Sequence, residues 1–185
     1  MRTSLLRLAP LLAGFAALSA CDQPKFRDKG DAATPAAEAP AAAGAPAARV
    51  IPTRAEAVPA VPAWAAAHMG KPLRAQFPKT GVCKGNTDVV DVRFTGQPSG
   101  VQILGWGWDV PKAARVSRVV LVDVGMKIVG AGEGGAPRPD VPTALPEISD
   151  PNAGWTAVTQ AAGPLDAYGV VGDGDAVCAL GHIEF

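Results

Sequence analysis

The sequence contains little of the material from which most metal and catalytic sites are made. Its 185 residues include 2 His and 1 Tyr, and aromatic residues make up only 5%. The 17 basic residues balance the 17 acidic ones, so the basic excess of a nucleic-acid-binding protein is missing. No Gly-x-Ser-x-Gly, His-Glu-x-x-His or Cys/His metal spacing occurs. We therefore expect no nucleic-acid partner, no cofactor, no metal and no enzymatic activity.

The first 20 residues are typical of an export signal. Arg2 and Arg7 supply a positive segment, and residues 8–18 form an apolar run. That run is too short to cross a bilayer of ~30 Å as a helix, which favours a signal peptide over a transmembrane span. The run ends in Leu18-Ser-Ala-Cys21.

This ending resembles the lipobox of bacterial lipoproteins. The resemblance implies cleavage between Ala20 and Cys21, a diacylglyceryl thioether on Cys21 and acylation of the new amine. Two or three acyl chains anchor a domain stably, because each buried methylene contributes ~0.8 kcal/mol. The alternative is an ordinary signal peptide with a chance cysteine. Asp22 resembles the signal for retention in the inner membrane, so we expect the periplasmic face of that membrane, with the outer membrane as the alternative.

Residues 21–80 read as a lipidated cysteine followed by a disordered linker. Between Asp31 and Ala67, 18 of 37 residues are Ala and 6 are Pro. The prolines interrupt every potential helix, and the scarcity of large apolar residues leaves ordering entropy without compensation. Trp64 and His68 mark the one place where a turn could pack on the domain or contact a partner.

The formal charge divides unequally along the chain. Residues 22–82 carry eight basic and five acidic residues, whereas residues 83–185 carry seven and twelve. The basic part suits an anionic membrane surface, and the acidic part should be held away from it.

Residues 81–185 predict a single all-β domain. Short β-branched or alternating runs recur between turn signals, which is typical of a β-sandwich of the immunoglobulin-like or jelly-roll-like kind. The expected strands are residues 89–94, 101–108, 118–124, 126–129, 155–158, 168–171 and 176–185. One brief helical turn is expected over residues 140–145, with Asp140 as its N-cap.

Several short motifs occur in a fixed order in this region: Cys83-x-x-Asn-x-Asp, Gly105-Trp-Gly-Trp-Asp, Arg138-Pro-Asp-Val and Asn152-x-Gly-Trp. The set resembles a small extramembrane β-sandwich domain appended to some bacterial membrane glycosyltransferase-like and other cell-envelope proteins. Gly107 and Trp155 replace the alanine and phenylalanine usual there. The resemblance implies an accessory module that faces a glycan, and it brings no catalytic residues.

The sequence has three cysteines, one after the predicted signal peptide and two in the predicted β-domain. Once Cys21 carries lipid, Cys83 and Cys178 form an even pair in an oxidising compartment, and we expect a disulfide between them. Closing a loop of about 96 residues contributes ~4 kcal/mol in the chain-entropy model. The alternative is a pair of free or catalytic thiols.

Two glycine-rich segments invite ligand-binding interpretations that their context disfavours. Residues 130–135 spell Gly-x-Gly-x-x-Gly, but the prolines that follow prevent the helix a dinucleotide site needs, so we expect a flexible loop. Residues 172–175, Gly-Asp-Gly-Asp, contain acidic calcium-type ligands. An Asp-Gly hairpin turn explains the same residues, and too few oxygen ligands are in view for calcium.

The candidate ligand-binding residues are aromatic and charged. Trp106 and Trp108 share a strand face and could stack on a sugar ring, although burial is the usual fate of tryptophan. The remaining candidates are Asp109, Arg138, Asp140 and Trp155, and an Arg138–Asp140 pair that pins a loop is an alternative role for those two.

The sequence thus predicts a membrane-anchored, non-catalytic β-domain that binds or scaffolds in the cell envelope. An envelope glycan is the first expected partner, on resemblance alone. The alternatives are a scaffold for an inner-membrane protein complex and a carboxylate-dependent glycan hydrolase.

Overall fold

A computed structural model describes residues 50–185; the predicted signal peptide, Cys21 and the first part of the linker lie outside these residues. The elements in chain order are β1 (Thr53–Arg54), the 3-10 helix η1 (Ala63–His68), α1 (Leu73–Gln76), β2 (Lys79–Thr80), β3 (Cys83–Phe94), β4 (Gly100–Asp109), β5 (Ala114–Arg115), β6 (Arg118–Val122), β7 (Ile128–Ala136), α2 (Asp140–Ala144), β8 (Gly154–Thr159), β9 (Leu165–Val171) and β10 (Ala176–Ile183).

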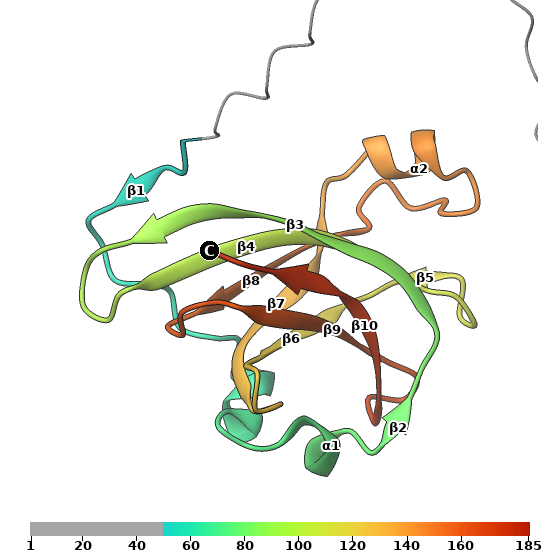
Figure 1. The fold of residues 1–185 in the computed structure, drawn as a ribbon. Helices are drawn as coiled ribbons and strands as arrows, with labels where there is room; N and C mark the ends of the chain where they lie inside the picture. The colour runs from blue at the N-terminus through green and yellow to red at the C-terminus, as the bar shows by residue number, and fades with distance from the viewer. Residues whose placement is uncertain (1–49) are drawn as a thin grey trace, which may run out of the picture. The chain divides into compact units, whose positions relative to one another are not determined.

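The prediction of a single all-β domain is confirmed. The strands form one hydrogen-bonded sheet in the order β1-β3-β4-β8-β7-β6-β9-β10-β2, and β5 pairs with β4. The sheet curls so that the β3–β4 hairpin arches over β9 and β10, and the two halves face each other as the layers of a sandwich do (Figure 1). The curl brings β3 and β10, which stand near opposite ends of the strand order, side by side.

The main core lies inside this curled sheet. Alternate residues of the strands point into it, including Ile103 from β4, Leu121 from β6 and Trp155 from β8, all without solvent exposure. Trp155 fits because the neighbouring inward position on β4 is Gly105, where a Cβ would lie 2.2 Å from the indole. The size of the tryptophan and the absence of a side chain at Gly105 are therefore complementary.

A second apolar cluster lies on the outside of the sheet. Val120 and Val122 alternate with the inward residues of β6 and are nevertheless fully buried. Leu73 and Phe77, which lie between β1 and β2 in the chain, cover them. The hydrophobic run of β6 therefore has two buried faces, as near-continuous apolar strands usually do.

The covering segment, residues 50–80, is called the belt below. It crosses the outer face of the sheet from one end of the strand order to the other. Its first strand pairs parallel with β3, its last strand pairs parallel with β10, and between them the amide of Leu73 donates to the Met126 carbonyl at 2.9 Å. The belt therefore joins β3 to β10 across the outer face of the sheet.

The belt corrects the predicted domain boundary. Residues 50–80 were expected to belong to a disordered linker, yet Val58, Ala65, Leu73 and Phe77 are buried. The prolines that break helices do not prevent burial of the side chains between them, because the outer face of the sheet supplies an apolar surface. Trp64 and His68 lie on η1 and pack on the domain, where the Arg118 guanidinium lies 5.3 Å from the Trp64 ring centre.

The glycine-rich segment at residues 130–135 is not a loop. It forms the middle of β7, paired with both β6 and β8. A Cβ added at Gly132 would lie 1.8 Å from the Thr156 carbonyl oxygen, so the curvature of the sheet there excludes every other residue. The glycines serve close strand packing, which the motif alone does not reveal.

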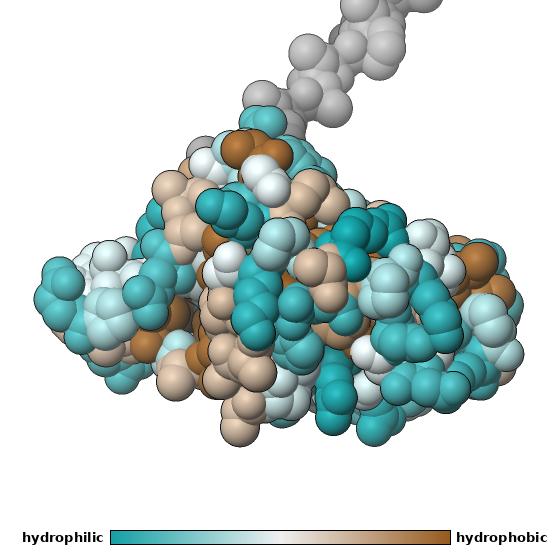
Figure 2. Space-filling model, turned by 90° about the horizontal axis from the view of Figure 1, so that it is seen from below, coloured by the Kyte–Doolittle hydropathy of each residue, from teal (hydrophilic) through white to brown (hydrophobic). Residues whose placement is uncertain are grey.

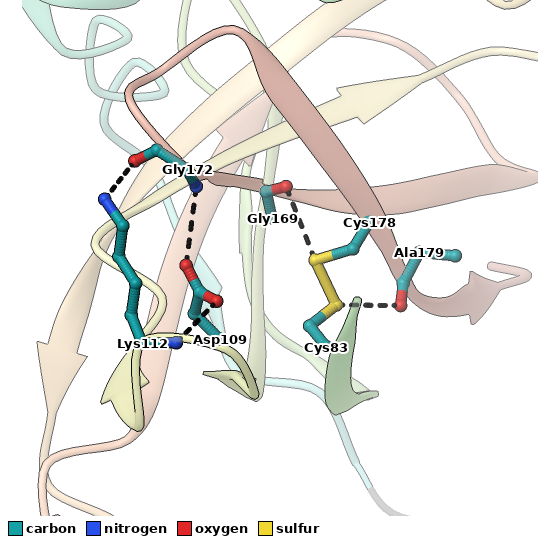
Figure 3. Close-up of a disulfide and its surroundings, with 7 residues drawn as sticks. All are labelled: Cys83, Asp109, Lys112, Gly169, Gly172, Cys178 and Ala179. Carbon is teal, nitrogen blue, oxygen red and sulfur yellow. Dashed lines mark hydrogen bonds between the residues drawn. A yellow bond between two sulfur atoms is a disulfide. The ribbon is translucent and has the colours of Figure 1, made fainter. Parts of the chain in front are cut away.

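The predicted disulfide is present between Cys83 of β3 and Cys178 of β10, with the two Cα atoms 5.8 Å apart. Figure 3 shows the carbonyl groups of Ala179 and Gly169 beside the two sulfurs. Among the described strands no ladder joins β3 to β10, so the disulfide links the two strands where the curled sheet meets itself.

The Gly-Asp-Gly-Asp segment is the turn of the β9–β10 hairpin, in which Val171 pairs with Ala176. Its two carboxylates bind lysines, Asp173 with Lys112 and Asp175 with Lys79. The hairpin interpretation of the sequence is therefore confirmed.

Candidate functional site

The two tryptophans of β4 lie on its outer face, as their spacing predicted, but they differ in exposure. Trp108 is only 5% exposed, because Val141, Ile148 and Ala153 of the α2 region cover it. Trp106 is half-buried at the border of the same cluster. Of the pair, only Trp106 has ring surface available for a ligand, so the interpretation of Trp108 as a stacking platform is wrong.

Two further predicted residues have structural roles. Trp155 has no exposed surface and fills the main core. Asp109 is 6% exposed and accepts from the backbone amides of Lys112 and Gly172, both at 3.4 Å, which ties the end of β4 to the β9–β10 turn (Figure 3). Trp155 is therefore a packing residue of the core, and Asp109 fixes the end of β4.

Four polar side chains gather on the outer face near α2, and we call them the polar cluster: Asn86, Asp88, Arg138 and Asp140. Arg138 donates to Asp140 at 2.8 Å and also to Asp88, and Asn86 donates to the other oxygen of Asp88 at 2.7 Å. The Arg138–Asp140 pair of the sequence analysis is thus present, although Asp140 is 62% exposed and not buried.

Local structure explains how these residues meet. Asp88 lies at a bulge in β3, where the register with β4 shifts between Thr87 and Val89. The bulge leaves Asp88 without a partner on β4, and the alternation of the strand places it on the same face as Asn86, two residues earlier. Asp140 is the first residue of α2 and not its cap, since the N-cap position is Pro139 and no side chain caps the helix. The carboxylate of Asp140 turns to Arg138 instead.

Trp106 lies between members of the polar cluster. Its direct partner on β3 is Asn86, and its direct partner on β8 is Gly154. Gly154 has no side chain, and the Arg138 Cγ lies 2.7 Å from where its Cβ would be, so the stem of Arg138 fills that space. One half-buried aromatic ring is therefore flanked by the Asn86 amide on one side and the aliphatic stem of Arg138 on the other.

A cavity of about 310 Å³ adjoins these residues. Its lining combines apolar groups with the charged pair Asp88 and Arg138; the other lining residues are Val89, Leu104, Gly105, Ala136, Pro137 and Trp155. A concave, mainly apolar surface with a few fixed polar groups is the usual composition of a small-ligand site.

Electrostatics holds the Arg138–Asp140 pair in its charged form. The hydrogen bond from Arg138 lowers the pKa of Asp140 below its usual value of 3.8, and the same bond raises the pKa of Arg138. Asp140 is thus a poor general acid at neutral pH, because a general acid needs a raised pKa. The Arg138–Asp140 pair therefore presents a fixed donor and a fixed acceptor.

The lowered pKa predicts how the pair responds to acid. A carboxyl whose pKa is depressed in the folded protein stabilises it above the unfolded pKa, and this contribution disappears as the pH falls through the folded pKa. We expect the Asp140 carboxyl to titrate below 3.8 by NMR and to return to about 3.8 in Arg138→Met. The Asp150 carboxyl, whose pKa the Asn152 amide and Arg115 lower, should not move in that variant. An unmoved Asp140 pKa would contradict the pairing.

Asn86 and Asp88 complete the site although they are absent from the predicted set of ligand-binding residues. The signal was available, because both belong to the motif that begins at Cys83. What the motif does not reveal is the bulge that leaves Asp88 without a partner on β4, because the bulge depends on how β3 pairs with β4.

Within residues 50–185, no three His, Cys, Asp or Glu side chains are arranged to hold a metal ion. No helix in this part of the chain is both long and apolar enough to span a bilayer. Comparisons of the whole chain with protein-family models, curated proteins and solved structures gave no match.

Proposed function

We propose that this protein is a lipid-anchored envelope protein whose β-domain binds a glycan without cleaving it. The observation that carries the proposal is the placement of the half-buried Trp106 between Asn86 and Arg138, together with the cavity that Arg138 and Asp88 line. An aromatic face offers an apolar surface to one side of a sugar ring, while planar amide, carboxylate and guanidinium groups can bind its hydroxyls.

The non-catalytic part of the proposal rests on the carboxylates. A glycosidase needs one carboxylic acid that is protonated at working pH and a second that is free to act as base or nucleophile. In the polar cluster Arg138 binds both Asp88 and Asp140, and it lowers the pKa of Asp140. Binding without turnover is the activity that such a paired arrangement favours.

Binding should depend on Trp106. Trp106→Ala removes the only exposed ring face of β4, so we expect retention on polysaccharide extracted from the producing cells to fall at least tenfold, equivalent to ~1.4 kcal/mol. Affinity gel electrophoresis measures this retention. Trp106→Phe should keep part of it, because a smaller ring remains.

The control variant is Val124→Ala, at an 83% exposed position in the β6–β7 turn, which should bind as the wild type does. A thermal unfolding curve must accompany each variant, so that lost binding is separated from lost fold. If wild-type protein passes through every envelope polysaccharide unretained, the glycan proposal is wrong, and crosslinking in cells to an inner-membrane protein becomes the next test.

The anchor has an independent test. Cys21→Ala removes the thiol to which the diacylglyceryl group would attach, so we expect the protein to move from the membrane fraction to the soluble periplasmic fraction. Fractionation and immunoblotting measure the shift. Cys83→Ala is the matched control, since Cys83 pairs with Cys178 and should leave membrane attachment intact. Membrane retention of Cys21→Ala would contradict lipidation.

A further inference from the structure

A second cavity, of about 610 Å³, lies where the belt crosses the start of β7 and the end of β8. We call it the belt cavity. Its wall includes Val58, Val61 and Met69 from the belt and Ile128, Val129 and Val158 from the two strands. Its volume falls within the range of about 300–1,000 Å³ that is usual for small-ligand sites. It shares no lining residue with the cavity that Asp88 and Arg138 line, so it is a separate candidate site.

The belt is hydrogen-bonded to the rest of the domain on both sides of the belt cavity. The Val58 amide donates to the Pro98 carbonyl at 2.9 Å, and the Gly70 amide donates to the Ile128 carbonyl at 2.8 Å. Figure 2 shows the molecule from below, the side on which α1 lies in Figure 1, and hydrophobic residues show there among hydrophilic ones. The belt wall of the cavity is therefore part of the fold.

The interior of the belt cavity is uncharged and offers few polar side chains. Within the described part of the chain, no charged side chain lines it, and the two polar ones are Thr159 and Gln160. The buried Thr159 hydroxyl donates to the Val129 carbonyl at 2.8 Å and accepts from the Ala161 amide at 3.0 Å. Gln160 is exposed. A sugar or an ion would lose hydration here without replacement, so the interior favours an apolar ligand.

Two exposed lysines flank the belt cavity. Lys71 follows the lining residue Gly70, and Lys127 precedes the lining residue Ile128. The backbone holds the two segments together, because Pro72 and Lys127 form an isolated antiparallel bridge and the Ile128 amide donates to the Lys71 carbonyl at 3.0 Å. Among the ion pairs of residues 50–185, none involves either lysine.

The carboxylate of the same turn does not bind these lysines. Asp123 accepts from the Gly125 amide at 2.9 Å and from the Lys127 amide at 3.0 Å, so it is engaged with the backbone of the turn. Two cations against one carboxylate leave an excess of positive charge at this edge of the cavity. An uncharged interior beside a cationic edge is complementary to a molecule with an apolar chain and an acidic end.

We propose that the belt cavity binds a single-chain anionic lipid, with the acyl chain inside the cavity and the acidic head group at Lys71 and Lys127. A free fatty acid and a lysophospholipid with an acidic head both have this chemistry. The acyl chains expected on Cys21 do not, because their thioether and amide attachments offer no charge to the lysines. The inference is independent of glycan binding, since the two sites share no residue.

The test uses the full protein on vesicles of phosphatidylcholine that contain a small fraction of palmitic acid with a diazirine in its chain. After irradiation, digestion and mass spectrometry locate the labelled peptides. We expect label on peptides that contain residues 58–61 and 128–129. Excess unlabelled palmitic acid or lysophosphatidylglycerol should reduce this label about tenfold, and the stronger competitor identifies the source of the lipid.

The head-group part of the proposal is tested by charge reversal. Lys71→Glu combined with Lys127→Glu should lower the label on these peptides about tenfold, because an acidic head group would then be repelled. Lys84→Glu combined with Lys112→Glu makes the same change in net charge at two other exposed lysines and should leave the label unchanged. A diazirine on hexadecylamine, which has a cationic head, should label these peptides at least tenfold less than palmitic acid does.

The chain part of the proposal is tested by filling the cavity. Val61→Trp places an indole in it from the belt side, where Val61 is half-buried, and should remove the label from residues 128–129. Val82→Trp adds the same ring at a 62% exposed position outside the cavity and should have no effect. A thermal unfolding curve for each variant separates lost binding from lost fold, and the charge-reversal variants test the site without any change in the cavity wall.

Several results would overturn the proposal. One is label spread over exposed peptides without competition by either unlabelled lipid, and another is equal labelling by the cationic chain. Label that reaches residues 128–129 only in Cys21→Ala would mean that the protein's own acyl chain fills the cavity, which also contradicts the proposal. None of these results bears on glycan retention, which Trp106→Ala tests separately.

Discussion

A chain that begins at residue 81 is expected not to fold, although the sequence predicts that its domain starts there. Removing the belt exposes Val120, Val122 and Val177 on the outer face of the sheet, all of which are buried in the complete domain. Truncating a buried Leu or Phe to Ala alone costs about 2–5 kcal/mol, and small domains have only about 5–15 kcal/mol in total. Loss of Leu73 and Phe77 together is therefore enough to unfold the protein.

The measurement is a urea titration followed by circular dichroism. The chain that begins at residue 81 should give no cooperative transition and should bind a hydrophobic dye, whereas a chain that begins at Ala47 keeps every described contact and should match the full protein. Phe77→Ala in the full chain should lower the free energy of unfolding by about 3–5 kcal/mol. A cooperative transition at an unchanged midpoint without the belt would contradict this account.

Loss of the Cys83–Cys178 disulfide is expected to cost about 4 kcal/mol, because it releases a long loop of the unfolded chain. Replacing both cysteines by Ala should lower the unfolding midpoint by roughly 10–15 °C, at about 2–4 °C for each kcal/mol. Differential scanning calorimetry measures the shift, and wild-type protein under reducing conditions should show the same one.

The position of the disulfide adds a local expectation. It joins β3 to β10 where the described strands have no ladder between them, so its loss should loosen these two strands first. Hydrogen exchange should then speed up in β3 and β10, whose outer neighbours β1 and β2 are only two residues long, more than in β6 and β8, which have longer strands on both sides. A double variant with an unchanged midpoint and unchanged exchange in β3 and β10 would contradict the role given to the disulfide.

The strands of the domain could be predicted from the sequence because each carries its own signal. Alternation at residues 89–94 and the β-branched run expected at 118–124 depend on local pattern; the first lies within β3, and the second forms β6 as far as Val122. The cysteine pair was predictable for another reason, since the prediction that Cys21 carries lipid leaves Cys83 and Cys178 as the only possible pair.

The belt and β7 could not be predicted because their signals depend on partners far along the chain. Ala- and Pro-rich sequence is typical of a linker, and only the apolar outer face of the sheet explains why Leu73 and Phe77 are buried. The glycine-rich sequence of β7 favours a loop, and only the close approach of Thr156 to Gly132 explains why a strand has glycine there. Both errors have the same origin, because a local sequence pattern contains no information about the distant residues that pack against it.

The candidate site was predictable by residue type and not by arrangement. Arg138 and Asp140 are close in sequence, and their pairing was foreseen as an alternative. The different exposure of the two tryptophans depends on the α2 region, which covers Trp108 and leaves Trp106 half-buried. The contribution of Asp88 depends on a bulge in β3.

The path of the belt also determines when the domain can form during synthesis. Lys79 of β2 pairs with Ala176 of β10, and Cys83 of β3 forms a disulfide with Cys178 of β10. The early strands β2 and β3 therefore cannot make all their contacts until β10, the last strand, has been synthesised. Folds dominated by such distant pairings form slowly, on the scale of milliseconds to seconds, since loop closure precedes the contacts that reward it. The described domain therefore cannot complete its sheet until its final residues emerge, a property that suits the proposed export of the chain before folding.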